Sequence, residues 1–309
     1  MKHQTIEVGV DLGKLSFDAS IRGHGSTWPN TPAGIRRFLD HLDSLGAPVR
    51  VSCEATGAYT RRLILACLKR GTPIALLNAR NVRAFARSTG RLAKTDRIDA
   101  GVIARFAETF DPAVLDPSWI RQERLHQFHQ RLDALIDSRA RRRTSLEYYD
   151  DPAIRAEVKR EIAALTRRIE SYQDAIDHFI GQDEAIRRKR ELLTRTTGIG
   201  PAVSMTLVVT FPELGTLNRK EAAALAGLAP MNRDSGAARG RRTIQAGRSK
   251  PRKALYMAAL TAAHRNPMFA PHYQQLIARG KPVKVALCAI ARKLLIHLNT
   301  QLKEAALQT

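Results

Sequence analysis

Cysteine is scarce in this chain of 309 residues, which contains only Cys53, Cys67 and Cys288. The three cysteines are widely separated and form no C-x-x-C pair. The sequence therefore supports neither a disulfide framework nor a zinc knuckle, because both need paired cysteines. A reducing compartment suits such a chain.

Long apolar runs are missing as well. No stretch of about 18 apolar residues occurs, so the sequence offers no membrane-spanning helix. The first four residues lead directly into an expected strand, without the apolar region of a secretory signal. We therefore expect a cytoplasmic protein without a membrane partner.

Acidic residues are few compared with basic ones. The chain has 29 Asp and Glu against 51 Lys and Arg, which gives a formal net charge of +22. Such a surplus predicts a polyanionic partner, and nucleic acid is the most common one, because Lys and Arg displace the counterions of its phosphates. Residues 191–309 carry 18 of the basic residues and 5 of the acidic ones, so the last third should be the main electrostatic surface.

The first 110 residues alternate between strand-like and helix-like segments. Apolar runs predict strands at Ile6–Asp11, Leu15–Ile21, Val49–Cys53 and Pro73–Leu77. Amphipathic or capped segments predict helices at Pro32–Leu45, Arg61–Arg70 and Asp96–Ala107. This order is typical of an α/β sheet covered by helices.

Beyond Trp119 the pattern changes to helical periodicity. Apolar residues recur at intervals of three or four from Ile154 to Phe179, which predicts an antiparallel helical hairpin or coiled coil. Its arms should be about Gln122–Tyr148 and Ala153–Ile180. From Leu192 onward the chain is helical and basic. We therefore predict three domains, covering residues 1–115, 116–190 and 191–309.

Four acidic residues stand where a metal-dependent enzyme needs them. Asp11 and Glu54 each end an expected strand, and Asp96 and Asp99 are spaced i, i+3 at the start of an expected helix. Each alone has an ordinary explanation, such as a turn cap or a favourable position in the helix dipole. Together they predict one divalent-cation site, for Mg²⁺, because uncompensated carboxylates that gather in one place repel each other.

A glycine-rich basic segment follows in the last third. Its candidate nucleic-acid contacts are Arg233, Arg239, Arg241, Arg242, Arg248, Lys250, Arg252 and Lys253. Ser235 lies among them, but no adjacent His or Lys base is evident. On chemistry alone, a serine that contacts phosphate is therefore favoured over a nucleophile.

Three further motifs have both a functional and an ordinary reading. Gly198 and Gly200 form a turn before an expected helix, where backbone N–H groups can bind a phosphate, although a plain inter-helix turn fits equally well. Tyr256 lies in an apolar helix and is expected to pack there. His126 and His129 are one helical turn apart without other ligand types nearby, so both are expected on a helix surface.

With Asp11, Glu54, the segment Lys94–Ala100 and Asp234-Ser235-Gly236 in place, the chain resembles the DEDD transposases of the insertion-sequence one-ten family. The resemblance covers almost the whole length, and the order of the motifs carries it. It implies an α/β RNase H-like (RuvC-like) N-terminal domain, a helical coiled-coil spacer and a mainly α C-terminal transposase domain.

The resemblance also implies an activity. Family members are recombinases guided by a structured bridge RNA that pairs with donor and target DNA, and they act at the bacterial nucleoid. Ser235 matches their nucleophilic serine, which reverses the preference above, and Asp11, Glu54, Asp96 and Asp99 match their magnesium-binding acids. A composite site between protomers of a dimer or tetramer is implied. One departure is Gln245-Ala246-Gly247-Arg248, where the family often has a Gly-Gly-Arg run.

Two other functions remain open. A RuvC-like Holliday-junction nuclease would use the acids to activate water and would leave Ser235 idle. A non-catalytic RNA- or DNA-binding protein would explain the charge but not the grouped acids.

Overall fold

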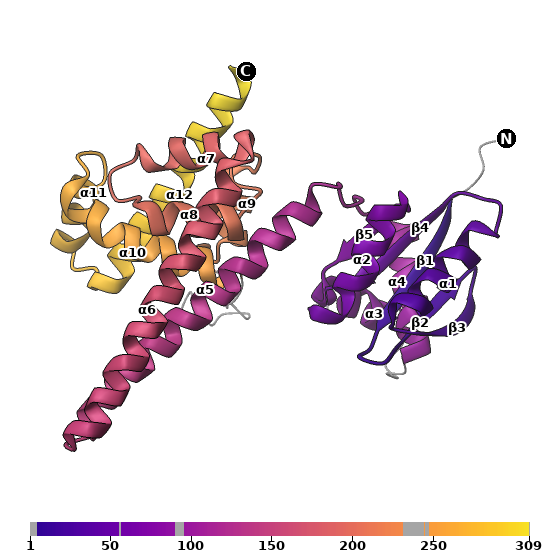
Figure 1. The fold of residues 1–309 in the computed structure, drawn as a ribbon. Helices are drawn as coiled ribbons and strands as arrows, with labels where there is room; N and C mark the ends of the chain where they lie inside the picture. Colours follow the sequence, from indigo (N-terminus) through magenta and orange to yellow (C-terminus); the bar gives the residue numbers. More distant parts are fainter. Residues whose placement is uncertain (1–4, 56, 90–95, 231–243, 245–246, 309) are drawn as a thin grey trace. The chain divides into compact units, whose positions relative to one another are not determined.

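The computed structural model describes residues 5–55, 57–89, 96–230, 244 and 247–308, without the side chains of residues 58 and 96–98. The described chain forms two compact units, Met1–Arg121 and Gln122–Thr309. Each has its own hydrophobic core, and Figure 1 draws the helices and strands of both units. The division into three domains stays a prediction.

The N-terminal unit is built on a mixed five-stranded sheet with the order β3-β2-β1-β4-β5. Its strands are β1 (Ile6–Leu12), β2 (Ser16–Ile21), β3 (His24–Pro29), β4 (Val49–Glu54) and β5 (Ile74–Leu77). β2 pairs antiparallel with both β1 and β3, whereas β1, β4 and β5 run parallel. The carboxyl ends of these three parallel strands therefore meet at one edge of the sheet.

Helices cover both faces of this sheet. α1 (Pro32–Asp43) and α2 (Ala58–Arg70) bury Phe38 and Leu63 against the side chains of one face. α3 (Ala79–Ser88) and α4 (Asp96–Phe110) bury Val82 and Ile103 against β5 on the other. The expected α/β sheet covered by helices is thereby confirmed.

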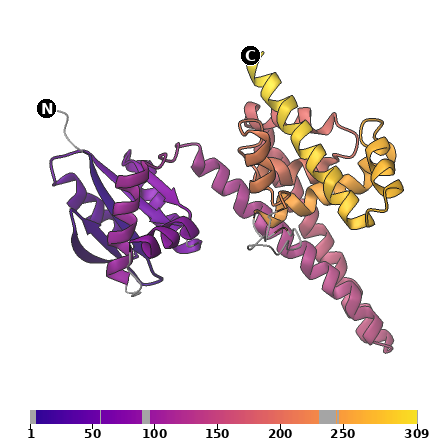
Figure 2. The same ribbon diagram turned by 180° about the vertical axis from the view of Figure 1, so that it is seen from behind.

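The C-terminal unit is helical in its described residues. A long helical pair, α5 (Trp119–Ser145) and α6 (Pro152–Gly181), lies side by side in both views (Figures 1 and 2) and buries Leu132 and Ile176 between its helices. Asp151 begins α6 by accepting hydrogen bonds from the first backbone N–H groups. The expected helical hairpin is present, and its coiled-coil character stays a prediction.

The remaining helices pack around α12. They are α7 (Glu184–Thr194), α8 (Pro201–Thr210), α9 (Arg219–Leu225), α10 (Ser249–Arg265), α11 (Ala270–Ala278) and α12 (Val283–Leu307), and a 3-10 turn, η1 (Leu146–Tyr148), follows α5. Small buried residues on α10, such as Ala259 and Ala262, let its neighbours approach closely. Across the described residues, no helix is both long and apolar enough to cross a membrane.

Candidate active site and nucleic-acid interface

Asp11 and Glu54 lie side by side at the carboxyl edge of the sheet. The β1–β4 ladder ends with the pair Val10 and Cys53, and the two acids follow it by one residue on each strand. Because neighbouring positions of paired parallel strands share a face, both carboxylates lie on the same side of the sheet. Both residues are partly buried.

The surroundings of Gly9 show that α4 covers the side of the sheet on which Asp11 and Glu54 lie. Gly9 precedes Asp11 by two residues and so shares its face. A Cβ atom at Gly9 would lie 2.1 Å from the Ala100 carbonyl oxygen and 2.4 Å from the Ala104 nitrogen. α4 therefore rests directly on the backbone of β1, which only glycine permits. Asp99, adjacent to Ala100, is carried to the same face.

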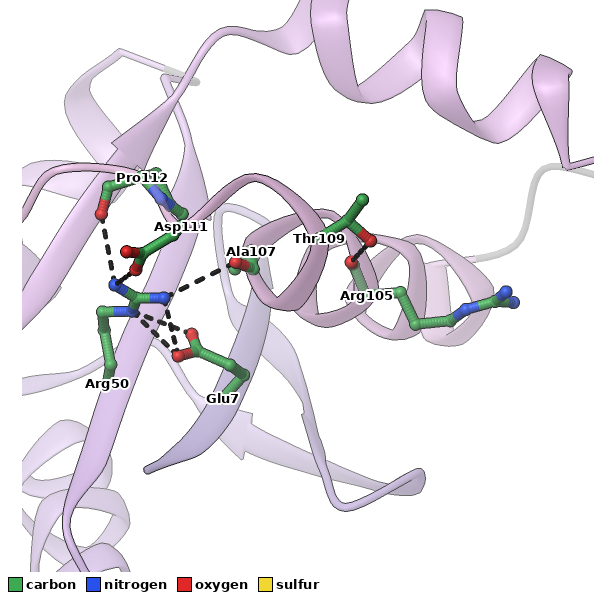
Figure 3. A network of polar contacts seen from close by, with 7 residues as sticks. All are labelled: Glu7, Arg50, Arg105, Ala107, Thr109, Asp111 and Pro112. Atoms are coloured by element: carbon green, nitrogen blue, oxygen red, sulfur yellow. Dashed lines mark hydrogen bonds and ion pairs between the residues drawn. The ribbon is translucent and has the colours of Figure 1, made fainter. Parts of the chain in front are cut away.

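Arg50 fixes the direction in which α4 crosses the sheet (Figure 3). From the start of β4, its Nε donates to both Glu7 carboxylate oxygens at 2.9 and 3.0 Å. Its Nη1 donates to Asp111 Oδ1 at 2.5 Å, and its Nη2 reaches the Ala107 carbonyl oxygen at 3.5 Å. The last turn of α4 is thus held at the amino ends of β1 and β4. Its first turn, with Asp99, consequently lies toward their carboxyl ends.

The Arg50–Glu7 pair of this network is largely buried. The side chains of Arg50 and Glu7 are only 16% and 7% exposed. Burial alone would lower the pKa of Arg50, but its hydrogen bonds to Glu7 and Asp111 outweigh burial and raise that pKa. Arg50 therefore stays charged and serves as a positioning residue for the helix that carries the acids.

The donor set at this edge suits a hard divalent cation. Carboxylate oxygens are the ligands that Mg²⁺ prefers, and Asp11, Glu54 and Asp99 supply them from three elements. Asp96 opens α4, and its side chain lies outside the described part of the chain. Among the described side chains, no three of His, Cys, Asp or Glu are grouped closely enough to hold a metal ion. The type of donor and the shared edge fit the predicted site, and coordination by all four acids stays a prediction.

The basic segment with Ser235 falls mostly outside the described residues, together with Arg233, Arg239, Arg241 and Arg242. The structure does describe the points where this segment begins and ends. A Cβ atom at Gly247 would lie 2.2 Å from the Gly227 nitrogen, so the two backbones touch. Gly227 and Gly247, which lie on either side of this segment in the sequence, are therefore in contact.

Arg248, the residue after Gly247, binds this contact region to the helical core. Its Nη1 and Nη2 donate to the two Glu213 carboxylate oxygens at 2.7 and 2.6 Å, and its backbone N–H donates to Leu225. Burial would raise the pKa of Glu213, but hydrogen bonds from Arg248 lead to a lowered pKa overall. The guanidinium is thus engaged within the protein, and a phosphate would have to compete with Glu213 for it.

The other three described basic residues of the interface lie in the first turns of α10. Lys250 Nζ lies 2.5 Å from Asp133 Oδ2, on α5. Arg252 Nη1 lies 3.5 Å from the Gly227 carbonyl oxygen, and Lys253 is exposed. Contacts of these residues with nucleic acid stay predictions.

His129 is buried, so its expected place on a helix surface is wrong. Its side chain is 3% exposed, with Nε2 at 3.2 Å from Thr206 Oγ1 and Nδ1 at 3.4 Å from Asp133 Oδ2. The 3.4 Å separation is an ion-pair distance without hydrogen-bond geometry. The reason for its burial is that α8 covers this face of α5. The sequence around His129 could not predict this burial, because α8 lies far from α5 along the chain.

The two glycines of the candidate phosphate turn differ in their surroundings. Gly198 has a φ of +108°, and a Cβ atom there would lie 3.0 Å from the Ala258 carbonyl oxygen, so the turn packs on α10. Gly200 is exposed and has open space around it, at the N-cap of α8. Packing therefore accounts for Gly198, and phosphate binding near Gly200 stays a prediction. Tyr256 is partly buried in α10.

Comparisons with known proteins match both units. A model of DEDD transposases of the IS110 type matches residues 8–148, and a model of the transposase IS116/IS110/IS902 family matches residues 190–274. The chain is also similar to the "Pilin gene-inverting protein" of Moraxella bovis, with 26% identity over 316 residues that cover 93% of this chain and 92% of that protein. The protein of the same name from Moraxella lacunata is 26% identical over 317 residues, with the same two coverages. The two family models together span well over half of the chain and lie on either side of α6. The chain belongs to the IS116/IS110/IS902 family of transposases, enzymes that recombine DNA.

Proposed function

We propose that this transposase cuts and rejoins the DNA strands of an insertion sequence through a covalent phosphoserine at Ser235. The observation that supports the proposal is that Asp11 and Glu54 follow the last pair of two neighbouring parallel strands, on the face of the sheet that α4, the helix of Asp99, covers. Carboxylates at such an edge can hold divalent cations, which organise a phosphate for attack.

The four acids Asp11, Glu54, Asp96 and Asp99 would hold Mg²⁺, which supplies positive charge at the scissile phosphate when it is bound. The chain contributes the placement of these carboxylates. Gly9 lets α4 lie on β1, and Arg50 holds the far end of α4. Both contacts fix α4 before DNA arrives, which would lower the cost of organising the site.

Ser235 carries out the covalent step. Its Oγ attacks phosphorus, the new O–P bond forms as the bond from phosphorus to a sugar oxygen breaks, and the serine proton leaves through solvent while the sugar oxygen gains one. In the second step a sugar hydroxyl of the new partner strand attacks the phosphoserine and releases Ser235. The neighbouring Arg233, Arg239, Arg241 and Arg242 offset the negative charge at phosphorus during both steps.

The partners are donor and target DNA and a structured bridge RNA that pairs with both. The basic last third supports a large polyanionic partner, because it carries 18 basic residues against 5 acidic ones. The relatives' name describes gene inversion, which itself requires that DNA be cut and rejoined. In a dimer or tetramer, the acids of one protomer meet Ser235 of another.

Trapping the covalent adduct tests this function. Labelled DNA is incubated with Mg²⁺, the copurifying RNA and each protein variant, and then run on a denaturing gel. Wild type and Tyr256→Phe should form a protein–DNA adduct, whereas Ser235→Ala and Asp11→Asn should not. Cleavage without an adduct in wild type would identify a junction nuclease that uses water. An adduct that survives in Ser235→Ala but disappears in Tyr256→Phe would make the tyrosine the nucleophile.

A further inference from the structure

The stretch between the acids Glu54 and Asp96 is entirely free of acidic residues. Residues 55–95 contain nine Lys and Arg and no Asp or Glu. The basic surplus of the N-terminal unit is therefore concentrated between two residues of the candidate metal site. Three of these nine residues, Arg80, Arg83 and Arg87, belong to α3.

These three arginines form one exposed stripe along α3, here called the α3 arginine stripe. Positions i, i+3 and i+7 fall within an arc of about 60° at 100° per residue. All three residues are exposed. The opposite side of α3 buries Val82 and packs Phe85 against Phe106 of α4, with ring centroids 5.6 Å apart. The stripe therefore points away from the sheet.

The stripe begins at the edge of the sheet where the strands of Asp11 and Glu54 end. Glu54 pairs in register with Leu77, the last residue of β5. α3 follows at once, because the side chain of Asn78 caps it by accepting a hydrogen bond from the Arg80 backbone N–H at 2.9 Å. α3 also packs beside α4, whose first turn lies toward the same edge (Figure 1). A strand bound along the stripe would thus lead to Glu54 and Asp11.

No described residue neutralises the charge of the stripe. In the portion of the chain described by the structure, the guanidinium groups of Arg80, Arg83 and Arg87 have no ion-pair or hydrogen-bond partner. The exposed Arg70 on the other face is different, because it pairs with Asp40 and Asp43. Like charges one helical turn apart repel, so the stripe slightly destabilises α3 unless an anion binds it.

We propose that the α3 arginine stripe binds the phosphate backbone of the DNA strand that enters the carboxylate edge. This inference rests on the proposed function. The seven-residue span from Arg80 to Arg87 rises about 10 Å, close to three phosphate intervals of a duplex strand at about 3.4 Å each along its axis. Arginine suits this task because its planar guanidinium can bind a phosphate through two parallel hydrogen bonds.

The test compares two full-length variants that remove the same charge. The stripe variant is Arg80→Gln/Arg83→Gln/Arg87→Gln. The control is Arg36→Gln/Arg37→Gln/Lys69→Gln, which removes three exposed cations from α1 and α2 on the opposite face. Both are made in a Ser235→Ala background, so that binding is measured without strand cleavage. Affinity for a labelled DNA duplex is measured as a function of salt concentration.

The stripe variant should flatten the slope of log affinity against log salt by about 0.9 for each phosphate that the protein no longer neutralises, so by about 1 to 3 in total. The control should change the slope by less than half of the value for one phosphate. Equal flattening in both variants would show general charge attraction and would overturn the proposal. Weaker binding of structured RNA alone, with the DNA slope unchanged, would also overturn it. If the triple variant does not fold, Arg83→Gln against Arg37→Gln gives the same comparison for a single arginine.

The adduct experiment separates the two proposals. If wild type forms the adduct and the stripe variant keeps the full DNA slope, only the stripe proposal fails. If wild type forms no adduct while the stripe variant shows a flatter slope, the DNA contact stands and the phosphoserine mechanism fails.

Discussion

Gly227 and Gly247 are in backbone contact, although 19 residues lie between them in the sequence. A Cβ atom at Gly247 would lie 2.2 Å from the Gly227 nitrogen and 2.3 Å from its Cα, and both glycines have positive φ angles, +64° and +88°. This contact closes the base of the segment that contains Ser235. The two ends of the segment that contains Ser235 therefore lie next to each other.

Gly247→Ala should consequently damage both stability and reaction. The new methyl group has no space against Gly227, and a positive φ costs a residue with a side chain about 1–2 kcal/mol in addition. We expect a loss of more than about 2 kcal/mol in urea unfolding and little or no DNA adduct. The matched control is Gly280→Ala, which has a φ of +71° but open space around it, and so should show only the backbone cost. Equal destabilisation in both variants would rule out a role for the close approach of the two backbones.

Arg248→Ala should act on stability rather than on DNA binding. It leaves the half-buried Glu213 carboxylate without its paired donor, which should cost about 1–2 kcal/mol. The salt slope of DNA affinity should stay close to that of wild type. Arg241→Ala should do the reverse, and flatten the slope by about one phosphate contact. If Arg248→Ala flattens the slope and leaves stability unchanged, the ion pair with Glu213 is not its main role.

Arg50→Ala should destabilise the N-terminal unit strongly. It leaves Glu7 buried and unpaired, a change that typically costs about 3–5 kcal/mol. The double variant Glu7→Leu/Arg50→Met should recover part of this loss, because apolar side chains of similar volume replace the buried pair. Urea unfolding of wild type, Glu7→Leu, Arg50→Met and the double variant gives the coupling energy. Strictly additive effects would show that the pair does not act as a unit.

Lys189 should give the protein an alkaline pH dependence. Burial lowers the pKa of Lys189 to about 8, although the nearby Glu213 carboxylate raises it. In the unfolded chain the pKa returns to 10.5, so between pH 8 and 10.5 the unfolded state binds more protons than the folded state. Stability should therefore rise with pH in that window through this group. Subtracting the urea stability of Lys189→Met from that of wild type, at pH 7 to 10, isolates the effect, and a difference that does not change with pH would contradict it.

Much of the N-terminal sheet could be predicted because its strands alternate or run apolar. β3 was not expected, since His24–Pro29 is an exposed edge strand in which only Trp28 packs on the core. α3 was not expected either, because its buried side rests mainly on Val82 and Phe85, too few apolar residues for a clear helical period.

The candidate site could be predicted only in part. The order of Asp11, Glu54 and the two acids of α4 was readable because each follows or opens a regular element. The roles of Gly9, Arg50 and Arg248 were not, because each depends on a contact with a segment far along the chain. Burial of His129 was missed for the same reason, since its cover comes from α8.

Because α4 is fixed near its C-terminal end, the position of Asp99 at the acidic edge depends on the number of residues within the helix. Arg50 holds α4 at Ala107, and Gly9 contacts the helix at Ala104. The direction of the Asp99 side chain around the helix axis therefore depends on the number of residues between Asp99 and these two contacts. One residue inserted between Asp99 and Ala104 would turn the carboxylate by about 100° around the helix and away from Asp11. A residue inserted before Asp96 would not change the number of residues between Asp99 and these contacts. We therefore expect natural relatives to vary in length before the helix and to keep the length of its first two turns.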